Sequence, residues 1–156
     1  RSKEHLLIEA QRATFRQIHN RFQQRFQQGE RGLEPALEGL DSLWEAVVDM
    51  RSWAPFMVQT MSLASQGTPL REHADTFYEE AMDLLEAGVE AVFANDLDAL
   101  MVPPPRIARL VRVTLHGLVI ELAFAQSPEQ LRVVDQTYQD FRNSFAQLVL
   151  RGPLPS

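Results

Sequence analysis

Histidine and carboxylate side chains are the groups in this chain best suited to metal chemistry. A helical di-iron or di-manganese site needs a Glu-x-x-His pair on each of two helices. The sequence contains four histidines, His5, His19, His73 and His116. The residues three positions before them are Ser2, Arg16, Leu70 and Val113. Since none of these is a glutamate, the sequence predicts no site of this kind and no metal.

The sequence also lacks the other motifs that indicate catalysis. It contains no HExxH, GxSxG, P-loop or GxGxxG pattern. It has no cysteine, which excludes a thiolate nucleophile, a disulfide and a thiolate metal site. Serine and histidine both occur, but no strand-to-helix turn is predicted that would hold them as a catalytic triad. We therefore expect neither an enzyme nor a cofactor.

Aromatic and methionine side chains gather in the middle of the chain and favour a pocket. Methionine adapts to varied apolar shapes, and the short segment 56–64, bounded by Pro55 and Gly67, would make a movable wall for a cavity. For any one of these residues core packing is the simpler explanation, whereas the group favours a site for a small, largely apolar ligand. The predicted ligand-binding residues are Trp44, Trp53, Phe56, Met57, Met61, Phe77, Tyr78, Met82 and Leu115.

The segment 103–126 is predicted to be a helix with apolar residues on two faces. Its main stripe falls within about 120° of arc and should face the core. This stripe is Ile107, Ala108, Val111, Leu115, Leu118, Val119 and Leu122. The second stripe, on the opposite side, is Val113, Gly117, Ile120 and Phe124. Because Gly117 has no side chain to keep a neighbouring backbone away, the second stripe is predicted to contact another copy of the chain.

Two polar residues of the same helix, Thr114 and His116, would be able to add hydrogen bonds to the pocket. His116 lies between the two apolar stripes, so an interface or surface position is the favoured alternative for it. The final helix repeats apolar residues every three or four positions, as in a helical bundle. Its residues Tyr138, Phe141 and Phe145 are predicted to join the dimer interface.

Helix signals account for nearly the whole chain, and no strand pattern competes with them, so the predicted fold class is all-α. Ser2 and Thr68 are predicted N-caps, and Ser127 with Gln130 matches a capping box. The three consecutive prolines at 103–105 are expected to delay the fifth helix. The six expected helices cover about 2–28, 33–49, 56–64, 70–93 and 106–126, and a last one that begins after Ser127.

Length and composition describe one globular domain. The chain has 156 residues, 45% hydrophobic and 23% charged, which suffices for a single core. Residues 1–150 are expected to form that domain, followed by a Pro-rich tail at 151–156. The net charge of -6 repels nucleic acid, so any DNA contact needs a local basic patch or another part of the protein. No apolar run is long enough for a membrane span, and we expect a cytoplasmic protein.

The order of these helices resembles the C-terminal regulatory domain of the tetracycline-repressor (TetR) family of transcriptional regulators. The opening residues Ser2, Lys3, Glu4, His5, Leu6 and Leu7 are similar to the segment in which that family leaves its helix-turn-helix and begins its long connecting helix. The resemblance implies a six-helix domain in which residues 1–28 are that connecting helix. It also implies a homodimer formed by the last two helices of each copy, and a small-molecule effector bound among the middle helices.

In the family, effector binding releases the repressor from operator DNA. Lys3 matches the lysine that lies near the DNA backbone. No helix-turn-helix occurs in these 156 residues; the resemblance places it in about 45 to 60 residues upstream. The alternative is a stand-alone helical dimerisation or interaction module without a ligand.

Overall fold

The computed structural model describes residues 2–152, and in that range it is an all-α domain, as predicted. Two short 3₁₀ turns, η1 (Arg51–Trp53) and η2 (Leu97–Ala99), lie between helices. Within the same residues, no helix is long and apolar enough to cross a membrane. The six α-helices are α1 (Lys3–Gln27), α2 (Leu33–Asp49), α3 (Ala54–Ser65), α4 (Leu70–Val92), α5 (Pro104–Phe124) and α6 (Pro128–Val149).

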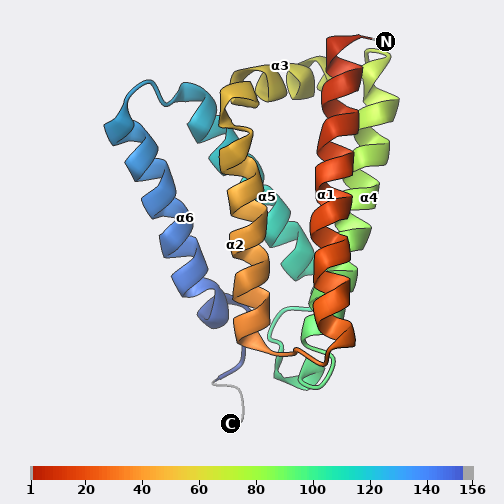
Figure 1. Ribbon diagram of the computed structural model, residues 1–156, viewed down its shortest axis with the longest axis vertical. Helices are drawn as coiled ribbons and strands as arrows, with labels where there is room; N and C mark the ends of the chain where they lie inside the picture. Colours follow the sequence, from red (N-terminus) through yellow and green to blue (C-terminus); the bar gives the residue numbers. More distant parts are fainter. Residues whose placement is uncertain (1, 153–156) are drawn as a thin grey trace.

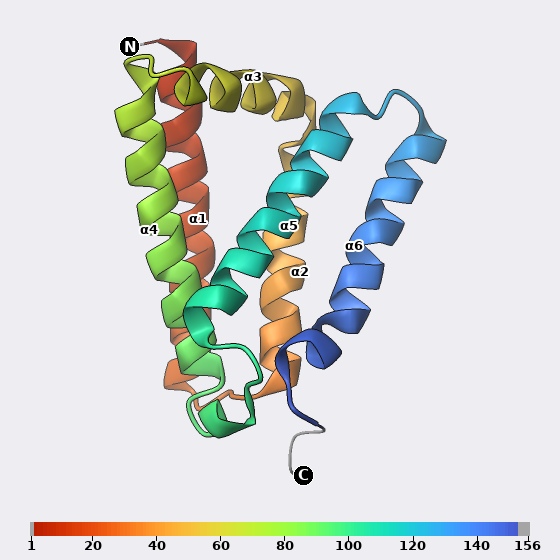
Figure 2. The ribbon, with the colours of Figure 1, turned by 180° about the vertical axis from the view of Figure 1, so that it is seen from behind.

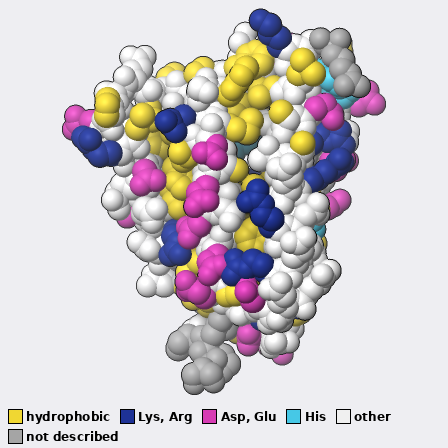
Figure 3. All heavy atoms as spheres, in the orientation of Figure 1, with side chains coloured by type: hydrophobic (Ala, Val, Ile, Leu, Met, Phe, Trp, Pro, Cys, Tyr) yellow, Lys and Arg dark blue, Asp and Glu magenta, His cyan; other side chains and the backbone are white. Residues whose placement is uncertain are grey.

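The helices form a cage that α5 crosses obliquely, with one face of α5 buried against its neighbours and the other exposed. In Figures 1 and 2, α1 and α4 lie side by side with their N-terminal ends at the same end of the molecule, and α3 crosses that end. Helix α5 runs obliquely through the middle and packs against α2, α3, α4 and α6. On the face shown in Figure 3, acidic and basic side chains are interspersed, as expected where α2 and its neighbours meet solvent.

Proline and hydroxyl residues define the helix ends, in part differently from prediction. Ser2 Oγ accepts a hydrogen bond from His5 N at 3.2 Å, as a cap should. The Thr68 hydroxyl instead donates to the Leu63 carbonyl at 2.9 Å, so it closes α3, and the residue before α4 is Pro69. The prediction for Thr68 was therefore wrong, because its hydroxyl bonds a carbonyl in the last turn of α3 rather than an N–H of α4.

The capping box before α6 is also only half formed. Ser127 Oγ accepts from Gln130 N at 3.2 Å, as predicted. The Gln130 side chain, however, accepts from Gln126 N at 2.6 Å rather than from Ser127. Gln130 therefore fixes the loop one residue further out than a capping box does.

The prolines start helices earlier than expected. Helix α3 begins at Ala54 with Pro55 in its first turn, and α5 begins at Pro104 with Pro103 as its N-cap. A proline at the first helical positions loses no hydrogen bond, because those N–H groups have no partner within the helix. Beyond α6, Arg151 N donates to the Ala99 carbonyl at 2.9 Å, so the domain includes the first residue of the predicted tail. Positions 153–156 of that tail lie outside the described residues.

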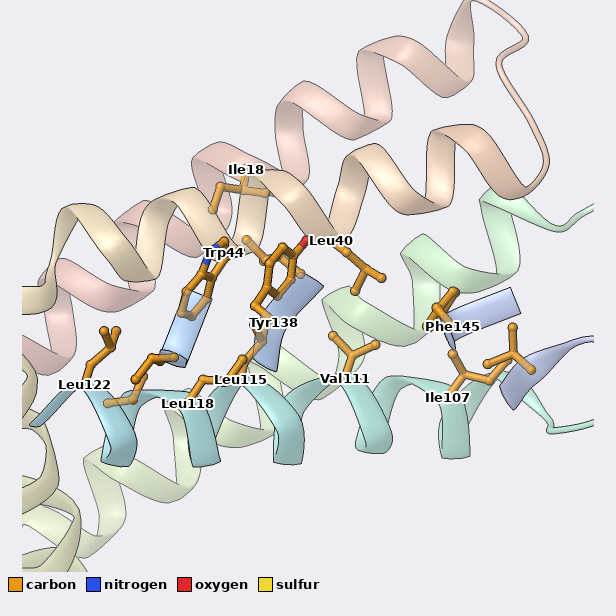
Figure 4. Packing of buried hydrophobic residues seen from close by; sticks show 14 of the residues in the cluster. Ile18, Leu40, Trp44, Ile107, Val111, Leu115, Leu118, Leu122, Tyr138 and Phe145 are labelled. Carbon is orange, nitrogen blue, oxygen red and sulfur yellow. The ribbon is translucent and has the colours of Figure 1, made fainter. Parts of the chain in front are cut away.

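The core is built on the main stripe of α5. All seven of its predicted members are buried, and Ile107 and Ala108 are completely inaccessible to solvent. Figure 4 shows Leu115, Leu118 and Leu122 following one another along α5 below Trp44 and Tyr138. The helical period thus predicted correctly which face of α5 meets the rest of the chain.

The interface predicted for α6 needs correction, since two of its three residues lie inside the protein. Tyr138 is 1% exposed and stacks on Trp44, with ring centroids 4.8 Å apart. Phe145 is 3% exposed, and the half-buried Phe141 packs edge-on against it at 6.1 Å. The heptad of α6 fits the core of its own chain, and a period of this kind does not say which neighbour a face meets.

A polar network joins α2 to α6 beside that aromatic stack. Tyr138 donates its hydroxyl to Asp41 Oδ1 at 2.6 Å, and Arg142 Nε donates to the two oxygens of Asp41 at 2.8 and 3.0 Å. Trp44 Nε1 donates to Asp135 Oδ1 at 3.0 Å. Burial raises the pKa of Asp41, but the hydrogen bonds from Arg142 and Tyr138 outweigh it, so its pKa lies below the ordinary value.

We predict that Asp41→Asn lowers the free energy of unfolding by about 1 to 2 kcal/mol, because it weakens hydrogen bonds to a charged, partly exposed group. Denaturant unfolding at pH 7 measures this value. The matched control is Asp49→Asn, an exposed position on the same helix, which should change little.

The difference in unfolding free energy between the wild type and Asp41→Asn should depend on pH. The folded pKa of Asp41 is below its unfolded value of about 3.9, so its contribution is complete above that pH and is lost as the pH falls through the folded pKa. The difference between wild type and Asp41→Asn should therefore shrink below about pH 4. A difference that grows on acidification would contradict the assignment.

Candidate ligand-binding site

A cavity of about 150 Å³ lies beneath α3, among the first five helices. An apolar cavity of about this size in another protein holds benzene. Each of the five helices contributes to its wall. The lining residues are Gln11, Thr14, Phe15 and Ile18 of α1; Leu43, Ala46 and Val47 of α2, with Met50 just after it; Met57 and Met61 of α3; Phe77, Tyr78, Ala81 and Leu85 of α4; and Arg112, Leu115, His116 and Val119 of α5.

The structure brings together five of the nine predicted ligand-binding residues at this cavity. The two methionines of α3 form the wall that crosses the end of the cage. The five are Met57, Met61, Phe77, Tyr78 and Leu115.

The other four predicted residues lie elsewhere. Trp44 is turned toward α6, where it stacks on Tyr138. Trp53 is 55% exposed on the η1 turn, and its closest ring is Phe56, at 6.3 Å. Met82 is half-buried and does not line the cavity. The sequence pattern identified the right segment but not which way each large side chain turns.

The prediction from sequence did not include the cavity-lining residues of α1 and α2. Phe15, Ile18, Leu43 and Val47 lie on the inward faces of their helices. A helical period identifies a residue as inward-facing. It cannot say whether that inward space is filled or hollow, because this depends on how far apart the helices lie.

Three polar residues meet at one side of the cavity. The Tyr78 ring stacks on the His116 ring with centroids 5.8 Å apart, and the Arg112 guanidinium carbon lies 5.4 Å from the Tyr78 centroid. Arg112 and His116 are four positions apart on α5, hence on the same side of the helix. His116, for which a surface or interface position was the favoured interpretation, is half-buried between the two apolar stripes and also lines the cavity.

Burial determines the protonation of this cluster. It lowers the pKa of His116, and the nearby Arg112 charge lowers it further. Burial also raises the pKa of Tyr78, despite the opposing effect of Arg112. At neutral pH, His116 is therefore an uncharged imidazole, Tyr78 keeps its hydroxyl proton, and Arg112 carries the charge of the cluster.

A second cavity of about 90 Å³ continues toward the other end of the cage. It lies among α1, α2 and α4, with Val111 and Phe145 closing one side. The residues lining both cavities are Phe15, Ile18, Leu43 and Leu85. The two spaces therefore adjoin, separated by hydrophobic side chains alone.

Ion pairs join α4, which forms part of the cavity wall, to α1. Arg12 Nε donates to Glu80 Oε2 at 2.9 Å, and a second nitrogen of Arg12 bonds the other carboxylate oxygen. Arg16 reaches the same carboxylate at 3.1 Å. These bonds hold the pKa of Glu80 below its ordinary value. Glu80 is two residues after Tyr78, so the anchor of α1 on α4 lies next to the polar cluster.

The predicted dimer stripe of α5 is exposed to solvent. Val113 is 57% and Phe124 71% exposed, and Ile120 is also exposed. A Cβ added to Gly117 would meet no atom within 4 Å. Lys3, the residue assigned to the DNA backbone by resemblance, is exposed in the first turn of α1.

Comparison with known proteins adds no assignment. The chain matches no protein-family model, no curated protein and no solved structure. In residues 2–152, no group of three or more histidine, aspartate or glutamate side chains is arranged to hold a metal ion. The site must therefore be interpreted from its own geometry.

We predict that the cavity binds a neutral apolar probe and that Ala81→Phe weakens this binding. Ala81 is buried in the cavity wall, and a phenyl ring there would occupy the space or force the wall apart. The affinity is measured by titration with N-phenyl-1-naphthylamine, which fluoresces in apolar surroundings. Ala81→Phe should bind this probe at least about tenfold more weakly than the wild type, a difference of about 1.4 kcal/mol.

The control is Ala13→Phe, on the exposed side of α1. It should bind the probe as the wild type does. Circular dichroism checks that Ala81→Phe remains folded, and the smaller Ala81→Leu should give an intermediate loss. Equal probe binding by wild type and by folded Ala81→Phe would show that the probe binds elsewhere.

Proposed function

We propose that this chain is the effector-binding and dimerisation domain of a TetR-like transcriptional regulator, a repressor that a small, largely apolar ligand releases from DNA. The observation that carries the proposal is that two faces of α5 present two different kinds of surface. One face of this helix lines a cavity under α3, and the opposite face carries an apolar stripe that is exposed to solvent. A ligand site and a dimer site on one helix are what such a regulator needs.

The exposed stripe favours a second copy of the chain as its partner. It includes Leu110, which is 43% exposed, and then Val113, Gly117, Ile120 and Phe124, at alternating spacings of three and four. Gly117 lies seven positions from both Leu110 and Phe124. A two-fold axis at Gly117 would therefore pair Leu110 of one copy with Phe124 of the other, which makes the stripe self-complementary. Such a contiguous apolar surface is unusual on a monomer.

Helix α6 extends this surface with residues other than those predicted from its heptad. Its exposed large apolar residues are Val133 and Leu148, near opposite ends of the helix. Between them lie the small side chains of Thr137 and Ser144, both exposed. Helices α5 and α6 of two copies would thus meet as a four-helix bundle with small residues at its centre.

The proposed mechanism links the cavity to α1 through α4. A ligand wedged against Met57 and Met61 would displace α3 and the Tyr78 side of α4. The Arg12–Glu80 ion pair would pass that displacement to α1, which leads toward the DNA-binding part. Major-groove half-sites are about 34 to 36 Å apart, so a change in separation of the two first helices weakens operator binding. The ligand acts only if it prefers one separation over the other.

We predict that the chain is a dimer and that Gly117→Arg makes it monomeric. The added side chain fits the isolated fold, since no atom lies within 4 Å of the new Cβ, but it places a charge in the centre of the proposed contact. Light scattering coupled to gel filtration measures the mass. The control is Gln17→Arg, which adds the same charge at an exposed position of α1. A Gly117→Arg variant that stays dimeric would rule out this stripe as the interface.

The regulatory proposal predicts that ligand changes the separation of the two first helices. The chain has no cysteine, so Lys3→Cys gives one spin label per copy, at the start of α1. Pulsed electron paramagnetic resonance should show a distance between the two labels that changes when N-phenyl-1-naphthylamine saturates the cavity. The double variant with Gly117→Arg, as a monomer, should show no such distance. An unchanged distance with probe bound would favour the stand-alone dimerisation module. Gene sequence upstream of Arg1 provides a second check, since a regulator requires a basic helix-turn-helix segment there.

A further inference from the structure

The charge distribution in the two cavities selects for one sign of ligand. Neither lining contains an aspartate or glutamate. The first cavity is lined by one charged residue, Arg112, and all its other polar linings are neutral: Gln11, Thr14, Tyr78 and His116. The electrostatic potential in this low-dielectric space is therefore positive on the α5 side, which favours an anionic ligand.

Arg112 also has a buried N–H group that is available to donate a hydrogen bond to a ligand. Its Nε is buried and, among residues 2–152, has no hydrogen-bond partner. Leaving a buried donor of a charged group unpaired costs free energy that an incoming acceptor recovers. The face of the Tyr78 ring, 5.4 Å from the guanidinium carbon, steadies Arg112 without using any of its N–H groups. A carboxylate matches this geometry, because two oxygens can accept from the planar guanidinium at once.

The remainder of the site is apolar and elongated. The first cavity holds Met57, Met61, Phe77 and Leu115 around the polar cluster. The second cavity adjoins it beyond Phe15 and Leu43 and is lined by aliphatic and aromatic residues, apart from His19. A ligand with its charge at Arg112 would have its apolar part directed along the axis of the cage.

We infer that the cavity binds a monocarboxylate with an extended apolar body, its carboxylate on Arg112 and its hydrocarbon part between α3 and the second cavity. This inference rests on the proposed function, in that the same cavity is the effector site, and it assigns the effector's chemical class. Tyr78 and His116 lie against the charged end of the ligand and supply neutral hydrogen-bonding groups. Arg112 is the residue that determines specificity.

Displacement of N-phenyl-1-naphthylamine by three ligands of equal chain length tests the inference. Decanoate carries the negative charge, decanol is neutral, and decylamine is positive at pH 7. We expect decanoate to displace the probe at a concentration 10- to 100-fold lower than decanol, the range of a hydrogen bond to a charged group, and decylamine to be weakest. Octanoate should bind more weakly than decanoate, because it buries two methylene groups fewer.

Arg112→Met removes the charge and keeps a flexible apolar stem, so it should weaken decanoate by 10- to 100-fold and leave decanol and the probe unchanged. Arg112→Lys should restore part of the loss, since it keeps a cation but not the planar pair of donors. The control is Arg109→Met, an exposed arginine one turn earlier on α5, which should bind all three ligands as the wild type does.

The outcomes separate this inference from the proposed function. If decanol displaces the probe as well as decanoate does, or if Arg112→Met binds decanoate normally, the assignment of an anionic ligand is wrong while the effector cavity stands. If the probe binds but none of the three ligands displaces it, the extended carboxylate is also ruled out. If Ala81→Phe leaves probe binding intact, the cavity itself is not the site, and the proposed function fails together with this inference.

Discussion

The burial of one face of α5 is the constraint on which the rest of this structure depends. Seven apolar side chains on that face must leave water, and no single neighbouring helix covers them all. Helices α2, α3, α4 and α6 pack around α5 from different directions. Because α3 lies across one end of this cage rather than along it, the helices diverge beneath it, and the cavity forms where they do.

The composition of the walls keeps that space open. Ala46 and Ala81 lie in the lining, where larger residues would fill the gap. Arg112 and His116 lie at the boundary between the buried and exposed faces of α5, which lets polar groups reach the edge of an apolar space. On the other side of the core, the buried stack of Trp44 on Tyr138 and the partly exposed ion pair of Asp41 with Arg142 join α2 to α6. Side chains in contact thus fill the space between α2 and α6, whereas a cavity remains under α3.

The first helix is held differently from the others. Besides its buried Leu7, Ile8 and Ile18, it is fastened by ion pairs, those of Arg12 with Glu80 on α4 and of Arg25 with Glu30 and Glu38 near the start of α2. Partly exposed ion pairs of this kind contribute modestly, on the order of 0 to 1 kcal/mol each. Such bonds fix a register and still permit small displacements, as the proposed role of α1 requires.

The sequence by itself determined the fold class, the helices to within a few residues and the faces that are buried, because a 3.6-residue period and proline or glycine at helix ends are local signals. It correctly separated the two stripes of α5 and the middle segment that holds Met57 and Met61. Only the tertiary structure decided that Trp44 packs on Tyr138 rather than in the cavity, that Tyr138 and Phe145 belong to the core, and that Arg112 and His116 meet Tyr78. The physical reason is that a period gives the direction of a side chain relative to its own helix. What it meets, and whether that space is filled, depends on the distances and angles between helices distant in sequence.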